Sequence, residues 1–191
     1  MAKRLLGLYK TFSSERPFLA AAATGGSLCA GADVFAQSVL REDFSKPFQW
    51  DSRRTLSMGI FGTVWYGGPC KFLYLRVYPK YIGEGTALQA GTTALVDVCG
   101  HTWFLLLPNF YLITGLVKGQ AVPDIKNQFL KEWFSAASGM TAFWLPTCTI
   151  NFYFVPQHSR IAFVGFMNFV NKTWLSWVAN YERQKERAAA A

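Results

Sequence analysis

Few residues of this sequence could carry chemistry, and those that could lie in or beside long apolar stretches. Six polar side chains are candidates: Asp33, Gln37, Asp97, His101, Asn151 and Arg160. Within this set two pairs are four residues apart, so the members of each pair share one face of a helix. An ionisable group within a membrane segment faces the protein interior or a water-filled cavity by default. These side chains are therefore expected to line a solute path or to fasten helices together.

These two interpretations stay open at the level of sequence. In the first, Asp33 and Asp97 line a path, and the interior favours cations because no Lys or Arg lies in the middle of any predicted span. In the second, the two acids pair with Arg54, Lys71 or Arg160 and fix the helix register. Small solutes are candidate partners only in the first.

The polar set does not form a catalytic motif. The sequence holds two histidines, His101 and His158, and lacks a Ser/His/Asp set, a His-Glu-x-x-His pair and a phosphate-binding loop. The four cysteines are spread one to each expected span, without metal-ligand spacing. They are Cys29, Cys70, Cys99 and Cys148. We expect no enzymatic activity, no metal and no cofactor, and we expect Asn151 to form a hydrogen bond between helices.

The composition explains what surrounds these residues. The chain has 191 residues and a formal net charge of +8, with 51% hydrophobic and only 16% charged residues, against about 25% charged in a soluble domain. Such a chain is neither disordered nor a disulfide-stapled secreted module. A lipid bilayer is the expected partner, nucleic acid is not, and self-association into a homo-oligomer is compatible with the sequence.

Four stretches are long enough to cross a membrane, for which a helix needs about 20 apolar residues. The fold class expected is an all-α membrane protein with a single domain over residues 1–191. Arg53, Arg54 and Lys71 are expected to extend their charged ends to the membrane interface. The spans are predicted at about 17–40, 54–75, 90–117 and 133–156, and an additional amphipathic or partly embedded C-terminal helix at about 160–182.

Small residues predict where the helices touch. Ala22, Gly26 and Ala30 recur every four residues and form a ridge that another backbone can approach closely. Gly59 and Gly62 in the second span supply a matching surface. The first two helices are therefore expected to pack together.

Pro156 is expected to end the fourth helix, because it lacks an N–H and disfavours helical geometry in the preceding residue. Arg160 then begins the next helix, where we expect it to pair with Asp33, Asp51 or Asp97. Asp33 itself is expected inside the bundle, away from lipid.

Several short motifs spread over most of the chain point to one family. They are Thr24-Gly25-Gly26-Ser27, Asp33 with Gln37, Asp51 with Arg54, Gly68-Pro69, Tyr74, Asp97, Trp144, Asn151-Phe152-Tyr153-Phe154-Val155-Pro156 with Arg160, and Trp174-Leu175-Ser176-Trp177. With them the sequence resembles the Mpv-seventeen and peroxisomal-membrane-protein-twenty-two family of small organellar membrane proteins. Ala32, Val98, Trp103 and Asn171 depart from its usual pattern.

The resemblance implies an integral protein with four helices in the mitochondrial inner membrane or, alternatively, the peroxisomal membrane. For some relatives it also implies weakly selective passage of small solutes. The function expected is thus a weakly selective channel that supports organellar metabolite homeostasis. The alternative is a non-conducting structural or assembly factor of the organelle membrane.

Overall fold

The structure is a computed structural model that describes residues 2–39 and 48–171. The described residues are helical and contain no strand. The elements are α1 (Ala2–Glu15), α2 (Pro17–Val39), α3 (Ser52–Trp65), η1 (Tyr66–Cys70), η2 (Leu73–Val77), α4 (Tyr78–Tyr81), α5 (Ala87–Leu95), η3 (Val96–Leu106), α6 (Leu107–Val117) and α7 (Val122–Phe154). Residues 160–171 form a last helical segment.

The three η elements are π-helical turns that interrupt α-helices without ending them. As a result, residues 52–81 and residues 87–117 each form one long helix. Pro69 lies within η1, where the wider turn accommodates its missing N–H. Pro108 lies in the first turn of α6, and Pro146 lies inside α7.

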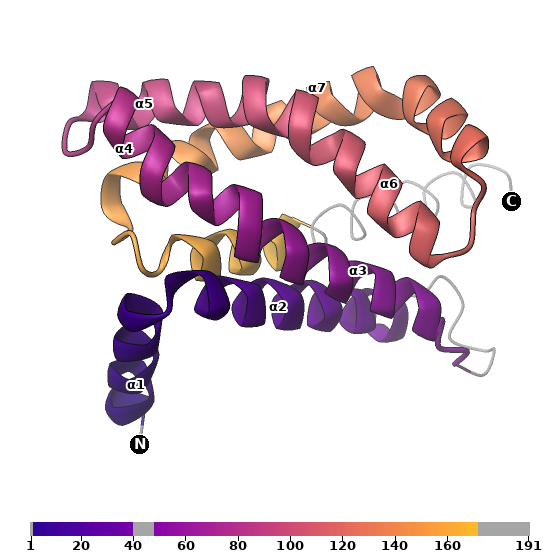
Figure 1. Cartoon of the computed structure of the whole chain (residues 1–191), viewed down its shortest axis with the longest axis horizontal. Coiled ribbons are helices and arrows are strands. Elements are labelled where there is room, and N and C mark those ends of the chain that lie inside the picture. The colour runs from indigo at the N-terminus through magenta and orange to yellow at the C-terminus, as the bar shows by residue number, and fades with distance from the viewer. Residues whose placement is uncertain (1, 40–47, 172–191) are drawn as a thin grey trace, which may run out of the picture.

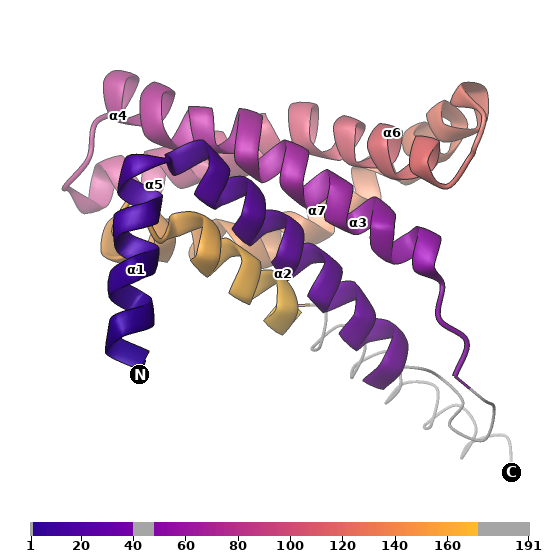
Figure 2. The same ribbon diagram turned by 60° about the horizontal axis from the view of Figure 1, so that its bottom comes forward.

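The long helices alternate in direction (Figure 1). α2 packs on α3, α3 packs on α6, and α7 packs on both α5 and α6. Residues 160–171 return beside α2, where Phe169 packs on Phe35 with ring centroids 4.5 Å apart. α1 projects from the start of α2 at an angle to the other helices, as both views show (Figures 1 and 2). The turns at 82–86 and 155–159 lie at one end of the bundle, and the turn at 118–121 lies at the other.

Glycines with positive φ end two of these long helices. Gly83 has a φ of 87° and its N–H donates to the carbonyl of Tyr78, which is the left-handed helix end that glycine favours. Gly119 has a φ of 81° just after α6. The following helix α5 begins with a capping box, in which Thr86 and Gln89 satisfy each other's backbone N–H groups.

Two of the predicted helix boundaries agree closely with the structure, and two were too short. α2 begins at Pro17 as predicted, and the third helix begins at Ala87. The second helix covers residues 52–81, and α7 begins at Val122, well before the predicted start at 133. Charged residues marked the predicted ends, but a charge keeps a segment out of lipid without breaking a helix. Lys126, Lys131 and Glu132 continue α7 on its exposed side.

In the part of the chain that the structure describes, two helices are long and apolar enough by themselves to cross a membrane, namely Pro17–Ser38 and Ala87–Val117. The helical class is thereby confirmed, and the two spans match the first and third predicted ones. The predicted C-terminal helix is described only through residue 171, and its remainder lies outside the described residues.

The predicted contact between the first two long helices is confirmed. A Cβ atom added to Gly25 would lie 2.6 Å from the carbonyl oxygen of Gly62, and one added to Gly59 would lie 3.5 Å from the Cβ of Ala30. A Cβ at Gly26 would collide with the hydroxyl of Thr63. The two backbones therefore touch because small residues face one another.

Candidate functional site

Asp97 lies in η3 and is buried, with 3% of its surface exposed. Four donors surround its carboxylate. Tyr74 and Tyr78 donate their hydroxyls at 3.0 and 2.8 Å, and Cys148 brings its thiol to 3.6 Å. The Nδ1 atom of His101 lies 2.7 Å from Oδ1. The long helices at 52–81 and 87–117 and the helix α7 thus each contribute to holding this one carboxylate.

The orientation of His101 follows from this contact. A carboxylate only accepts hydrogen bonds, so Nδ1 carries the proton that it donates to Asp97. Trp65 stacks on the imidazole ring, with centroids 5.5 Å apart and an interplanar angle of 6°. Asp97 and His101, expected from their four-residue spacing to share one helix face, thus contact each other, and Trp65 covers one face of the imidazole ring.

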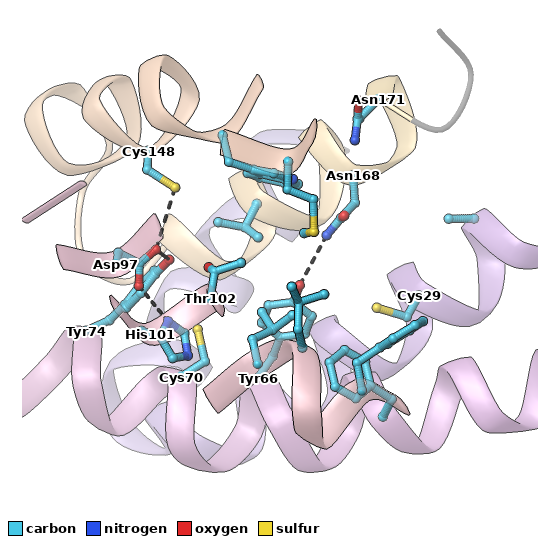
Figure 3. A pocket seen from close by; sticks show the side chains of 18 of the residues that line it. Cys29, Tyr66, Cys70, Tyr74, Asp97, His101, Thr102, Cys148, Asn168 and Asn171 are labelled. Atoms are coloured by element: carbon cyan, nitrogen blue, oxygen red, sulfur yellow. Dashed lines mark hydrogen bonds and ion pairs between the residues drawn. The ribbon is translucent and has the colours of Figure 1, made fainter. Parts of the chain in front are cut away.

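A cavity of about 260 Å³ lies beside this pair. Its walls come from α2, α3, η1, η2, η3, α6, α7 and residues 160–171, so it occupies the interior of the bundle. Figure 3 shows Asp97, His101 and Cys148 together in one part of the view and the hydrogen-bonded Tyr66 and Asn168 in another. Thr102 lies between them in this view.

The walls of the cavity are mostly apolar. Their aromatic and aliphatic members are Met58, Phe61, Leu106, Leu107, Phe110, Met140, Trp144 and Val164. No Lys or Arg belongs to the lining formed by the described residues. Of the six candidates from the sequence, Asp97 and His101 line this cavity, whereas the other four lie elsewhere.

Asp33 is buried inside the bundle, as predicted, with 1% of its surface exposed. Its Oδ1 accepts from Nε of Arg54 at 2.8 Å, and its Oδ2 accepts from Gln37 at 2.6 Å and from Thr55 at 2.8 Å. Gln37 also binds the backbone of Asp51 in both directions, at 2.8 and 3.2 Å. The network fastens α2 to the start of α3, so the acid acts here as a helix fastener.

The predicted partner of Arg160 was wrong. Its guanidinium pairs with Glu84 at 2.5 Å, and it also donates to the carbonyls of Val155 and Phe152. Asp33 lies in the network with Arg54, and Asp97 is enclosed by tyrosines. The 82–86 turn, which carries Glu84, lies at the same end of the bundle as the 155–159 turn, which precedes Arg160 (Figure 1).

Pro156 ends α7 as predicted. α7 stops at Phe154, Val155 adopts φ −90° and ψ 124°, and the next helical residue is Arg160. Other parts of the chain hold the intervening turn in place. The hydroxyl of Ser13 in α1 donates to the carbonyl of His158 at 2.9 Å, and Nζ of Lys71 lies 3.4 Å from the carbonyl of Gln157.

Lys71 was predicted to extend to the interface; only 2% of its surface is exposed, and its Nζ lies beside the 155–159 turn at one end of the bundle. The predicted hydrogen bond of Asn151 is absent from the described part of the chain. Its amide is fully buried, and neither its nitrogen nor its oxygen has a partner in the described part of the chain. Among the described residues, Asn151 therefore does not join helices through a hydrogen bond.

The structure shows where the remaining family motif residues lie, apart from Trp177. Gly68 and Pro69 lie in η1, and Trp144 lines the cavity. Phe152 packs edge-on against Tyr74 and Tyr78, while the guanidinium of Arg160 lies 5.4 Å from its ring centroid. Phe152 thereby lies between Arg160 and the two tyrosines that donate hydrogen bonds to Asp97. Trp177 lies outside the described residues.

Tyr74, Tyr78, Cys148 and Glu84 were missing from the predicted site. Tyr74 and Tyr78 are four residues apart on one helix face, the same spacing that selected Asp97 with His101. This signal could have found them. No local pattern places Cys148 or Glu84, because their contacts join segments 51 and 76 residues apart.

Comparisons of the sequence with known proteins identify its relatives. The model of the Mpv17 / PMP22 family matches residues 115–176. The chain is 28% identical to "Mitochondrial inner membrane protein Mpv17" of Danio rerio over 173 residues, covering 90% of this chain and 95% of the relative. It is 25% identical to the protein of the same name from Homo sapiens, with coverage of 90% and 96%. No solved structure matches this chain.

The names of these relatives confirm the predicted location in the mitochondrial inner membrane. The family match covers the Pro156 turn and the following helix, where the specific motif residues lie. These matches confirm the resemblance that the motifs indicated: the chain is similar to the Mpv17 / PMP22 family of membrane proteins.

Proposed function

We propose that this protein passes small solutes through the interior of its helical bundle with little selectivity. The observation that carries the proposal is the cavity of about 260 Å³, which is walled by all the long helices and lies beside the buried Asp97. A hollow in this position is where a path between helices of a bundle is expected. The proposal includes no catalytic step.

The proposed path requires four crossings. α2 has 23 residues and α7 has 33, and a rise of 1.5 Å per residue makes them about 35 and 50 Å long, against a hydrocarbon thickness of about 30 Å. The helices at 52–81 and 87–117 fall between these lengths. We propose that all four cross the membrane and that the last segment packs on them.

The selectivity proposed is weak and favours cations. The negative charge of Asp33 is met by Arg54 at 2.8 Å, so the interior field depends on Asp97. That carboxylate has tyrosine, histidine and thiol donors but no Lys or Arg partner in the described chain. No ring of carbonyls belongs to the proposed path, and similar ions are therefore expected to pass at similar rates.

One observation favours a second function. Both interior acids are held by three or more hydrogen bonds, the pattern expected if they only fasten helices. The second proposal is a non-conducting structural or assembly factor of the inner membrane. Self-association into a homo-oligomer is compatible with both proposals.

Recordings in planar bilayers distinguish the two functions. We expect the purified wild type to conduct and to show a reversal potential that marks a cation preference under a salt gradient. Asp97→Asn should reduce this preference, whereas Asp124→Asn should not, because Asp124 lies exposed at the start of α7. If the wild type never conducts, the proposal of solute passage is overturned and the non-conducting structural function remains. A cation preference that survives Asp97→Asn would remove Asp97 from the path.

A further inference from the structure

The cavity beside Asp97 is large for the interior of a small bundle. An apolar cavity of about 150 Å³ already holds a benzene molecule, and this one measures about 260 Å³. Its volume therefore suits one ring with a short substituent. Side chains that line such a space lack contact atoms on one side, and an apolar occupant restores those dispersion contacts.

The walls favour an apolar body with an aromatic ring. Phe61, Phe110 and Trp144 present aromatic surface to the cavity, and Met58 and Met140 add flexible thioethers. Methionine side chains adapt to ligands of varied shape and make favourable contacts with rings. These five side chains come from three helices, so an occupant would touch α3, α6 and α7 together.

The polar groups of the cavity specify a neutral head group. Thr102 is 6% exposed and lines the cavity, and its hydroxyl forms no hydrogen bond within the described part of the chain. The hydroxyl of Tyr66 accepts from Asn168 at 3.2 Å and keeps its own proton to donate. Both are uncharged, so they suit a hydroxyl or carbonyl group.

Charged head groups fit this cavity less well. The carboxylate of Asp97 attracts passing cations, but its oxygens already accept hydrogen bonds from Tyr74, Tyr78 and His101, so they do not bind a cationic head group directly. An anionic ligand would meet that same buried carboxylate with no Lys or Arg in the described lining to offset it. We propose that the cavity is a binding site for one small, neutral, mostly apolar molecule that carries a single hydroxyl or carbonyl head group near Thr102.

This inference goes beyond solute passage, because binding at equilibrium needs no conduction. The test uses the full chain in lipid nanodiscs and three fluorinated probes with one body: 4-(trifluoromethyl)phenol, 4-(trifluoromethyl)toluene and 4-(trifluoromethyl)benzoate. Fluorine NMR measures the bound fraction against nanodiscs without protein. We expect saturable binding of the phenol, weaker binding of the toluene and no binding of the benzoate.

Three variants locate the site. Thr102→Val keeps the shape and removes the hydroxyl, so it should weaken phenol binding by about fivefold and leave toluene binding unchanged. Ala32→Leu adds atoms at a lining position and should weaken both. Thr147→Val is the matched control, since Thr147 is buried in α7 away from the lining. It should change neither.

The outcomes are decisive in both directions. Binding no greater than in empty nanodiscs for every probe would overturn the site. If the phenol and the toluene bind equally well and Thr102→Val changes neither affinity, the head-group assignment is overturned. If the benzoate binds most tightly, the cavity is an anion site instead. Thermal unfolding of each variant shows whether it is folded. Because no gradient is applied, the site survives or fails independently of conduction.

Discussion

At the scale of single residues, the two interior acids have different surroundings. Asp33 meets a cation, an amide and a hydroxyl at the junction of α2 and α3, away from the cavity. Asp97 meets only neutral donors and His101, and it lines the cavity. The sequence alone does not distinguish the two acids, because each lies four positions before a polar residue. Their separate roles follow from what other helices bring to them.

Neutralising Asp33 should destabilise the protein. Asp33→Asn removes a charge that Arg54, Gln37 and Thr55 all bind, and a hydrogen bond to a charged group contributes about 1.5 to 3 kcal/mol. We expect the free energy of unfolding in detergent to fall by about 2 kcal/mol. Asp124→Asn, at an exposed position, is the control and should stay within about 0.5 kcal/mol of wild type. Equal stability of both variants would show that the Asp33 network fastens nothing.

At the scale of elements, contact between helices depends on small residues and on the turns at one end of the bundle. Predicting the α2 and α3 contact needed only the spacing of Gly26, Ala30 and Gly59, because helix periodicity alone determines which residues share a face. The partner of Arg160 could not be predicted in this way. Glu84 lies in a turn, and only the closed bundle brings that turn to the end of α7.

Two glycine substitutions test the contact between α2 and α3. Gly25→Ala would place a methyl group 2.6 Å from the carbonyl of Gly62, which forces the helices apart and should cost about 1 to 3 kcal/mol. Gly139→Ala in α7 meets open space and should be neutral or stabilising by up to about 1 kcal/mol. Chemical unfolding in mixed micelles measures both. A Gly25→Ala protein as stable as Gly139→Ala would contradict the close packing.

Charge reversal tests the connection between the 82–86 turn and the last helical segment. Arg160→Glu should reduce thermal stability, because the new carboxylate faces Glu84 and the carbonyls of Phe152 and Val155. Adding Glu84→Arg should restore part of the loss. Adding Asp124→Arg should restore none, since Asp124 lies in the first turn of α7 at the other end of the bundle. Equal rescue by the two second changes would mean that only net charge matters.

At the scale of the whole molecule, the sequence predicts the helical class, the family and the location, because hydrophobic length and motif residues are local properties. It does not predict the cavity. The cavity depends on how Phe61, Phe110, Trp144 and Val164 from separate helices come together to line it, and the periodicity of a single helix does not contain that information. For the same reason the sequence does not predict that the Asn151 amide is buried without a hydrogen-bond partner in the described chain, since this depends on the neighbouring helices.

The most direct test of the account is single-channel conductance of a variant that narrows the cavity. Thr102→Phe adds a ring inside the lining, whereas Leu105→Phe adds a ring on the outer side of the same helix, where Leu105 is 49% exposed. If solutes cross through the cavity, Thr102→Phe should reduce conductance by at least about half, an occlusion effect expected of a narrowed pore, and Leu105→Phe should leave it unchanged. Equal conductance of the wild type and both variants, or a wild type that carries no current, would contradict the proposed path.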